Sequence, residues 1–305
     1  VSRMAFLMYI LFLQLASAHH LLVEPGVSSS WKIFNTSYAM YLAVLGSMIH
    51  GLTVPGSIEA AQRARGYGKG LFEWLRKAPW GNPAFSGMFM SLVMFGFLGG
   101  ISGVVMGTEQ INLIMHNTLY VPGHFHATVV AGTTLAFMAM TYLVVPLIFR
   151  RHVMFPTVAK LQPYIFAIGI AGISLFMMGA GTLGVPRRHW DITFADALTS
   201  FQFSPAAFLM LALNGIFACM AALGGAMYIV VVVCSVFLGR KIGDNEKVQL
   251  GPVTGSQSAA AVAQYGSAGT LKIPGTVTLV AVFLVSFVLY YYVNWKYLAE
   301  LWPLR

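Results

Sequence analysis

His116-Asn117-Thr118-Leu119-Tyr120-Val121-Pro122-Gly123-His124-Phe125-His126 opens an apolar run that continues to Phe149, and this segment decides the fold prediction. Successive residues of an α-helix are about 100° apart around its axis, so the side chains of His124 and His126 point about 200° apart. A soluble metal site typically uses positions i and i+4, which place both imidazoles on one helix face. The i, i+2 spacing instead favours two separate metals in two pockets, one on each side of a single helix.

The composition places this helix in a lipid bilayer. The sequence is 58% hydrophobic and 9% charged, with a mean hydropathy of +0.75, whereas a soluble domain carries about 25% charged residues. We therefore predict an all-α fold, a polytopic membrane helix bundle that forms a single transmembrane domain over residues 1–305. A bilayer requires ~20 apolar residues per helix. About seven transmembrane helices are expected, over residues 3–18, 31–58, 83–106, 118–149, 161–183, 204–238 and 273–294. The second, fourth and sixth spans are longer than needed, which predicts tilt or helix that extends beyond the membrane.

The net charge of +9 is distributed as in a membrane protein and not as in a nucleic-acid-binding one. Thirteen of the 18 Lys and Arg residues lie on one side of the predicted spans: Arg3, Arg63, Arg65, Lys69, Arg76, Lys77, Arg150, Arg151, Lys160, Arg240, Lys241, Lys247 and Lys272. Short loops rich in Lys and Arg face the cytoplasm, so we expect the start of the chain inside and Arg305 outside. The lipid bilayer is thus an expected partner, and nucleic acid is not. The Ala-, Ser- and Gly-rich composition of Gly251–Gly269 predicts a flexible inner loop over residues 250–271.

The depth of two histidines in the membrane indicates a function. His124 and His126 lie six to eight residues into their predicted span, which is ~9–12 Å along a helix. Ionisable groups at such a depth are costly and usually functional. The alternative is that neighbouring hydroxyl groups satisfy both imidazoles. His116 lies at the water interface, where a solvated histidine needs no special explanation.

Two further pairs of polar residues lie on the predicted outer side. His19-His20 follows the first span, and adjacent imidazoles outside a regular helix can turn toward one ion, such as copper, iron or zinc. The alternative is a polar turn at the interface. Arg187-Arg188 lies on the side that is otherwise depleted of basic residues. The two guanidinium groups either extend to lipid headgroups or bind carboxylates such as heme propionates.

The second span is unusually polar for a membrane helix. It contains Asn35, Thr36, Ser37, Tyr38, Ser47, His50 and Thr53. Ser and Thr hydroxyl groups often bond back to their own helix, and this is one interpretation. The other is a chain of hydroxyl groups and water that leads protons inward from the cytoplasm.

The motifs together resemble a known family. His19-His20, Trp31-Lys32, Asn82-Pro83-Ala84-Phe85, His116 to His126 and Pro186-Arg187-Arg188 occur in this order. These motifs, in this order, resemble those of catalytic subunit I of the heme–copper oxidase superfamily. The Val-Pro-Gly before His-Phe-His resembles the B-type branch, which is prokaryotic. The resemblance extends from the start of the chain to about residue 238.

The resemblance implies specific roles and cofactors. His19 and His20 resemble two of the three ligands of the active-site copper. His124 resembles the proximal ligand of the high-spin heme, and His126 resembles an axial ligand of the low-spin heme. Arg187 and Arg188 would hold heme propionates, with His116 in the same outer network. The implied cofactors are therefore two hemes and copper, which reduce dioxygen to water with electrons from cytochrome c or a cupredoxin, coupled to proton translocation.

The sequence also departs from this family. Subunit I has about twelve spans, so the seven expected here predict its C-terminal part, in a prokaryotic cytoplasmic membrane. The N-terminal part, as a separate chain or missing segment, would supply the other ligands, and a subunit II-like partner would deliver electrons. Asn112 lies where relatives often carry an aspartate near a propionate. Two alternatives stay open: a nitric oxide reductase of the same superfamily and a secondary transporter.

Overall fold

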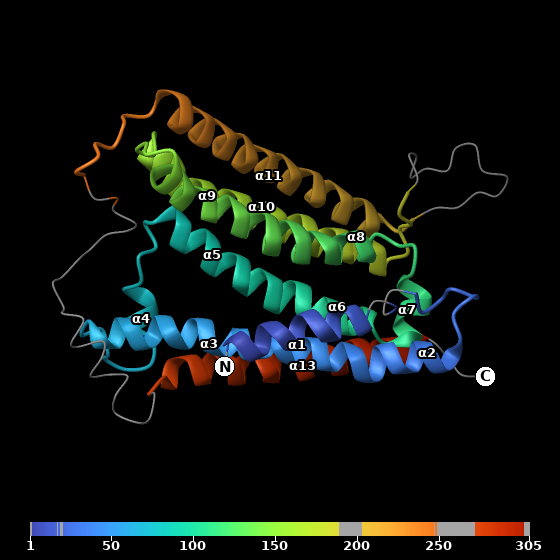
Figure 1. The fold of residues 1–305 in the computed structure, drawn as a ribbon. Coiled ribbons are helices and arrows are strands. Elements are labelled where there is room, and N and C mark those ends of the chain that lie inside the picture. The colour runs from blue at the N-terminus through green and yellow to red at the C-terminus, as the bar shows by residue number, and fades with distance from the viewer. Residues whose placement is uncertain are drawn as a thin grey trace. The chain divides into compact units, whose positions relative to one another are not determined.

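The computed structural model describes residues 2–16, 18, 21–188, 203–246, 248 and 272–301. The described residues are helical apart from turns and two isolated β-bridges, which confirms the predicted all-α fold (Figure 1). Five helical segments are long and apolar enough to cross a membrane: Ser29–Ala64, Pro83–Met106, Tyr120–Ile148, Pro156–Thr182 and Pro205–Leu238. The first and last expected spans coincide with the shorter apolar helices Arg3–Leu15 and Pro274–Tyr290. The expected loop over residues 250–271 lies outside the described residues.

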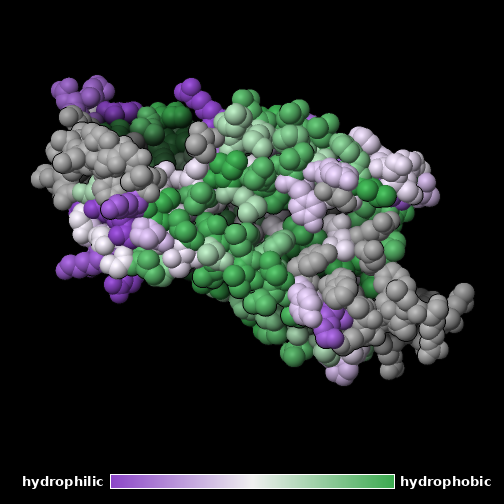
Figure 2. Space-filling view, turned by 90° about the horizontal axis from the view of Figure 1, so that it is seen from below, coloured by the Kyte–Doolittle hydropathy of each residue, from purple (hydrophilic) through white to green (hydrophobic). Residues whose placement is uncertain are grey.

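The helices group into two compact units. The first unit comprises Val1–Ala78, Gly107–Leu113 and Val253–Arg305, and the second comprises Pro79–Met106 and Ile114–Pro252. Apolar residues cover much of the molecular face that Figure 2 shows. Helices that cross a lipid bilayer require such long apolar stretches.

The second unit is built from four long helical segments. The first is α5 (Pro83–Val93), π-helix η2 (Met94–Gly100) and α6 (Ile101–Met106), and the second is α8 (Tyr120–Phe125), π-helix η3 (His126–Thr134) and α9 (Leu135–Ile148). Helices α10 (Pro156–Thr182) and α11 (Pro205–Leu238) complete it, and α7 (Glu109–Met115) lies between α6 and α8 in the chain. Asn82 caps α5, because its Oδ1 accepts from Ala84 N at 2.9 Å and Pro83 follows at the first helical position.

Small residues bring α10 and α11 together. A Cβ atom on Gly169 would lie 2.5 Å from the backbone N of Ala221, and one on Gly224 would lie 2.7 Å from Phe166 N. Ala131, Leu135 and Ile170 are buried in one hydrophobic cluster together with Phe166 and Ala221. Membrane helices lack a strong hydrophobic drive to associate, so close backbone approach at small residues supplies the packing energy.

The first unit contains α1 (Ser2–Leu15), α2 (Ser29–Ile33), π-helix η1 (Phe34–Ala39), α3 (Met40–Ala64), α4 (Glu73–Arg76) and α13 (Pro274–Leu301). The segment predicted over residues 31–58 continues as helix to Ala64, as its length indicated. Thr36 Oγ1 donates to Lys32 O at 2.7 Å, and Asn35 Oδ1 accepts from Ala18 N at 2.9 Å. These two polar side chains of the second span therefore hydrogen-bond to nearby backbone, Thr36 within its own helix and Asn35 to the segment after α1.

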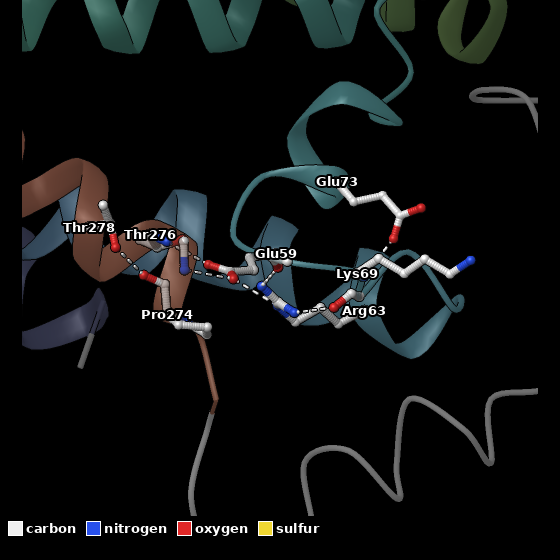
Figure 3. A network of polar contacts seen from close by, with 10 residues as sticks. Glu59, Arg63, Lys69, Glu73, Pro274, Thr276 and Thr278 are labelled. Atoms are coloured by element: carbon white, nitrogen blue, oxygen red, sulfur yellow. Dashed lines mark hydrogen bonds and ion pairs between the residues drawn. The ribbon is translucent and has the colours of Figure 1, made fainter.

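A buried carboxylate joins α3 to α13 (Figure 3). Glu59 is 0% exposed, and its oxygens accept from Gly275 N at 3.0 Å and from Thr276 N at 2.6 Å. Arg63 Nε donates to the same carboxylate at 2.7 Å. A negative charge at a helix N-terminus satisfies N–H groups that have no partner within the helix. Glu59 therefore fixes where α13 begins against the end of α3.

Candidate functional site

The helix that carries both predicted ligands changes its winding between them. α8 ends at Phe125, and π-helix η3 begins at His126. Segment η3 packs against η2, and a Cβ atom on Gly99 would lie 2.6 Å from Thr128 Cγ2. π-Helical turns are rare and occur frequently at functional sites. The predicted i, i+2 arrangement is therefore present on one continuous helix, with the second histidine at the start of a π-helical segment.

His124 is held by a serine from another helix. His124 is 6% exposed, and its Nδ1 lies 2.9 Å from Ser102 Oγ. The serine hydroxyl has a single proton, and its oxygen lies 2.5 Å from Leu98 O and 3.0 Å from Gly99 O, which can only accept. Ser102 Oγ therefore accepts from His124 Nδ1–H, and we assign the lone pair of this imidazole to Nε2.

His126 is held by its own helix. Its Nδ1 lies 2.7 Å from the carbonyl oxygen of Pro122, one turn earlier. A carbonyl oxygen only accepts, so Nδ1 carries the proton and Nε2 carries the lone pair. Histidines that bind metals almost always donate their other ring N–H to a protein oxygen, which fixes the tautomer and the ring orientation. The hydrogen bonds of both His124 and His126 meet this requirement for iron ligands.

Arg187 and Arg188 lie near the N-terminus of α8. Arg187 N donates to Asn117 O at 2.7 Å, and Arg187 Nε and Nη2 donate to Asn117 Oδ1 at 3.1 and 2.9 Å. Leu119 N donates to Val185 O at 2.9 Å, so two short backbone segments run side by side. The structure thus places Arg187 beside the residue that follows His116, at the end where α8 begins.

The electrostatics of this end favour an anion. Burial, and then the neighbouring Arg188 guanidinium, lower the pKa of Arg187. Within the described ranges, neither arginine forms an ion pair with a carboxylate. Two adjacent guanidinium groups without a compensating charge repel each other, and a ligand that carries carboxylates would relieve that repulsion.

The predicted copper ligands cannot be placed. His19 and His20 lie outside the described residues. Across the part of the chain that is described, no group of three or more His, Cys, Asp or Glu side chains could hold a metal ion. His124 and His126 each offer one imidazole, which suits a heme iron because the porphyrin supplies the other in-plane ligands.

Sequence reasoning missed two residues of this site, Ser102 and Asn117. Asn117 adopts a left-handed backbone conformation with φ of 63°, which asparagine tolerates better than most residues. Its place directly after His116 was a signal that could have identified it. Ser102 could not have been identified from the sequence, because a single serine in an apolar helix forms no pattern that distinguishes it from other serines.

Comparisons with known proteins identify the family of this chain. The family model described as "Cytochrome C and Quinol oxidase polypeptide I" matches residues 1–216. The cytochrome c oxidase subunit 1 of Thermus thermophilus is 34% identical over 201 residues, which cover 65% of this chain and 35% of that protein. The subunit of the same name from Alkalihalophilus pseudofirmus is 29% identical over 136 residues, 44% of this chain and 22% of that protein.

A solved structure of a heme–copper terminal oxidase dimer is also similar. One of its chains has a TM-score of 0.73 and 27% sequence identity, with 95% of this chain and 49% of that chain covered. This chain therefore spans about half of that chain and about a third of the Thermus protein. The family model covers more than two thirds of the residues of this chain. The chain therefore belongs to the cytochrome c and quinol oxidase polypeptide I family, the subunit I of heme–copper oxidases.

Proposed function

We propose that this chain is the C-terminal part of the catalytic subunit of a respiratory terminal oxidase. The complete enzyme would reduce dioxygen to water with electrons from cytochrome c or a cupredoxin, and would couple this to proton translocation. One observation carries the proposal: two imidazoles on a single membrane helix both donate Nδ1–H to protein oxygens, which assigns both lone pairs to Nε2. Family membership favours this function over the secondary transporter.

The proposal assigns each candidate residue a role. His124 would bind the iron of the high-spin heme, and His126 would bind the iron of the low-spin heme. His19 and His20 would be two of the copper ligands. When bound, the hemes and the copper supply the redox chemistry, whose potentials depend on axial ligation and on nearby charge. The protein contributes ligand orientation, through Ser102 for His124 and through a backbone carbonyl for His126.

The outer end of α8 would recognise heme carboxylates. Arg187 is aimed by Asn117 through two side-chain bonds, and Arg188 is exposed beside it. A guanidinium group binds a carboxylate with two parallel bonds, which fixes orientation as well as charge. His116 lies next to Asn117 in the chain and would belong to the same propionate network.

The function requires more than this chain. The N-terminal part of subunit I, in a separate chain or a missing segment, would supply the remaining heme and copper ligands. A subunit II-like partner would receive electrons from the donor. The assembly would lie in a prokaryotic cytoplasmic membrane, with the start of this chain inside and its C-terminus outside, as the Lys and Arg distribution predicts.

Two substitutions in the purified complex test the ligand assignment. His124→Ala is expected to abolish dioxygen uptake and to leave the low-spin heme spectrum intact. His126→Ala is expected to remove the low-spin signal. His152→Ala, which changes a histidine in a loop, serves as the control and should retain both signals. If either ligand variant keeps both heme spectra, the assignment is wrong.

The gas that is consumed tests the reaction. Dioxygen uptake measured with an electrode, without conversion of nitric oxide, supports the oxidase. Nitrous oxide formation from nitric oxide without dioxygen uptake would identify a reductase of the same superfamily. A colourless complex would overturn both.

A further inference from the structure

A second polar site lies in the second unit, at the opposite end of the α8–α9 segment from His124 and His126. After α9 the chain continues as Arg150-Arg151-His152, and after α11 it continues as Arg240-Lys241. The two segments pair as antiparallel backbone, with a bridge between Arg151 and Lys241. Ile242 N donates to Arg150 O at 2.8 Å, and His152 N donates to Arg240 O at 3.0 Å. Backbone pairing therefore brings four cationic residues and His152 together on two adjacent segments.

Two of the guanidinium groups are held without being neutralised. Arg150 Nη2 donates to Gly243 O at 2.5 Å and to Glu246 O at 3.3 Å, and Arg151 Nη1 donates to Gly239 O at 2.6 Å. These acceptors are carbonyl oxygens, which orient an arginine and leave its charge uncompensated. Each guanidinium group uses one nitrogen in these bonds and keeps its other N–H donors for a ligand.

The acidic residues nearby leave an excess of positive charge. Glu246 Oε1 lies 3.2 Å from Arg240 Nη2 and also 3.2 Å from His152 Nε2, so it is engaged with these two groups. Asp244 is the other carboxylate in this loop. Four cationic residues against these two carboxylates give the described part of the cluster a net charge of +2 with His152 neutral.

Exposed apolar side chains lie directly before both basic segments. Ile148 and Phe149 are 70% and 50% exposed at the end of α9, and Phe237 and Leu238 are 72% and 71% exposed at the end of α11. The helical segment that ends with α9, Tyr120–Ile148, and helix α11 are each long and apolar enough to cross a bilayer. A ligand at this place would therefore meet cations at one end and hydrocarbon-facing side chains at the other.

We propose that this cluster, Arg150, Arg151, Arg240 and Lys241, binds the phosphate headgroup of an anionic phospholipid, with its acyl chains against the exposed apolar residues. A soluble phosphate or nucleotide would gain nothing from that apolar surface. Arginine N–H groups bind phosphate oxygens through charge-assisted bonds, and basic residues next to a membrane helix attract anionic lipids. The proposal does not depend on the heme assignment.

Binding of phosphatidylglycerol to the full complex in detergent tests the proposal, with phosphatidylcholine as the neutral comparison. Removal of one cation should weaken phosphatidylglycerol binding about fivefold. Lys241→Gln tests the charge most directly, because the Lys241 side chain forms no hydrogen bond to a described residue, and the substitution therefore removes only the charge. The double variant Arg150→Gln/Arg151→Gln should weaken binding about 25-fold. Arg76→Gln/Lys77→Gln, an exposed basic pair in the first unit, removes the same charge as the matched control.

The outcomes separate the sources of the ligand. Selective loss in the cluster variants, with the control unchanged, supports a lipid site. Equal loss in the control would show general electrostatic attraction and would overturn the site. Equal binding of phosphatidylcholine would overturn the role of charge. Competition by millimolar inorganic phosphate in place of lipid would overturn the lipid as the ligand. Ile148→Asn should weaken phosphatidylglycerol binding without changing phosphate affinity, and an unchanged lipid affinity would contradict the apolar contact.

Discussion

Replacement of Ser102 by alanine tests how the protein orients His124. The substitution removes the acceptor of the imidazole Nδ1–H bond and leaves that donor in a site where Ser102 is 2% and His124 6% exposed. A buried donor that loses its partner costs about 1–3 kcal/mol. That free energy corresponds to a factor of about 5 to 150 in an equilibrium constant.

The surroundings of Ser102 narrow the range of this free-energy cost. Gly99 O lies 3.0 Å from Ser102 Oγ and would lose that contact in the variant. The imidazole can regain part of its bond if it turns toward this carbonyl, and this relaxation would place the loss at the lower end. Loss of an outer partner of a metal ligand typically costs about 10- to 100-fold in affinity or activity. We therefore expect the heme bound by His124 to bind about 10-fold more weakly, with a heterogeneous iron–imidazole bond.

The assay is the heme content and the iron–histidine stretching band of the purified complex. Ser102→Ala should lower high-spin heme occupancy under dilution and broaden or shift this band, while the low-spin signal stays. Ser91→Ala is the matched control on the same membrane segment, because Ser91 is 6% exposed and its hydroxyl donates to Met88 O at 3.0 Å. A Ser102→Ala complex with unchanged occupancy and an unchanged band would refute the reasoning, as would an equal loss in the control.

Three further predictions concern stability and potential. Glu59→Gln should lower the free energy of unfolding by about 3–5 kcal/mol, because it leaves Arg63 and a helix N-terminus without their buried carboxylate; thermal unfolding should show a smaller shift for Glu73→Gln, because Glu73 is only half-buried. Gly224→Val should cost about 1–3 kcal/mol through a clash with the α10 backbone, and a melting temperature equal to that of the unchanged protein would contradict the packing. Arg187→Gln should lower the reduction potential of a nearby heme, because removal of a positive charge disfavours electron uptake; a redox titration that shows an unchanged or higher potential would argue against a propionate partner.

The helices were predictable because their signals are local. The span expected over residues 204–238 appears as Pro205–Leu238, and the one expected over 83–106 appears as Pro83–Met106. Proline at the first helical position and a long apolar run are sufficient to define such segments. The change to π-helical winding at His126 was not predictable. Hydrophobic periodicity does not separate i→i+5 from i→i+4 bonding, and η3 packs closely against another π-helical segment, η2.

The partners of the site were not predictable for a related reason. A serine in an apolar helix most often bonds back to its own helix, and Ser102 does so through Leu98 O. Only the tertiary structure reveals that the same oxygen also accepts from His124. The sequence therefore identified the candidate ligands and could not identify what orients them. Asn117 shows the same limit, because its two bonds to Arg187 join residues 70 positions apart.

The Val-Pro-Gly motif that suggested the family has a physical basis in this chain. Pro122 lies in the first turn of its helix, where the missing N–H would have had no helical partner. Its carbonyl oxygen accepts from the ring of His126, so the proline position supplies the group that orients one candidate iron ligand. Gly123 admits α10, because a Cβ atom there would lie 2.8 Å from Met178 N, and its carbonyl accepts from Ser174 Oγ at 2.6 Å. A larger residue at Gly123 would therefore push α10 away from the segment that carries both histidines, and each residue of the motif constrains the site through packing or hydrogen bonding without itself binding iron.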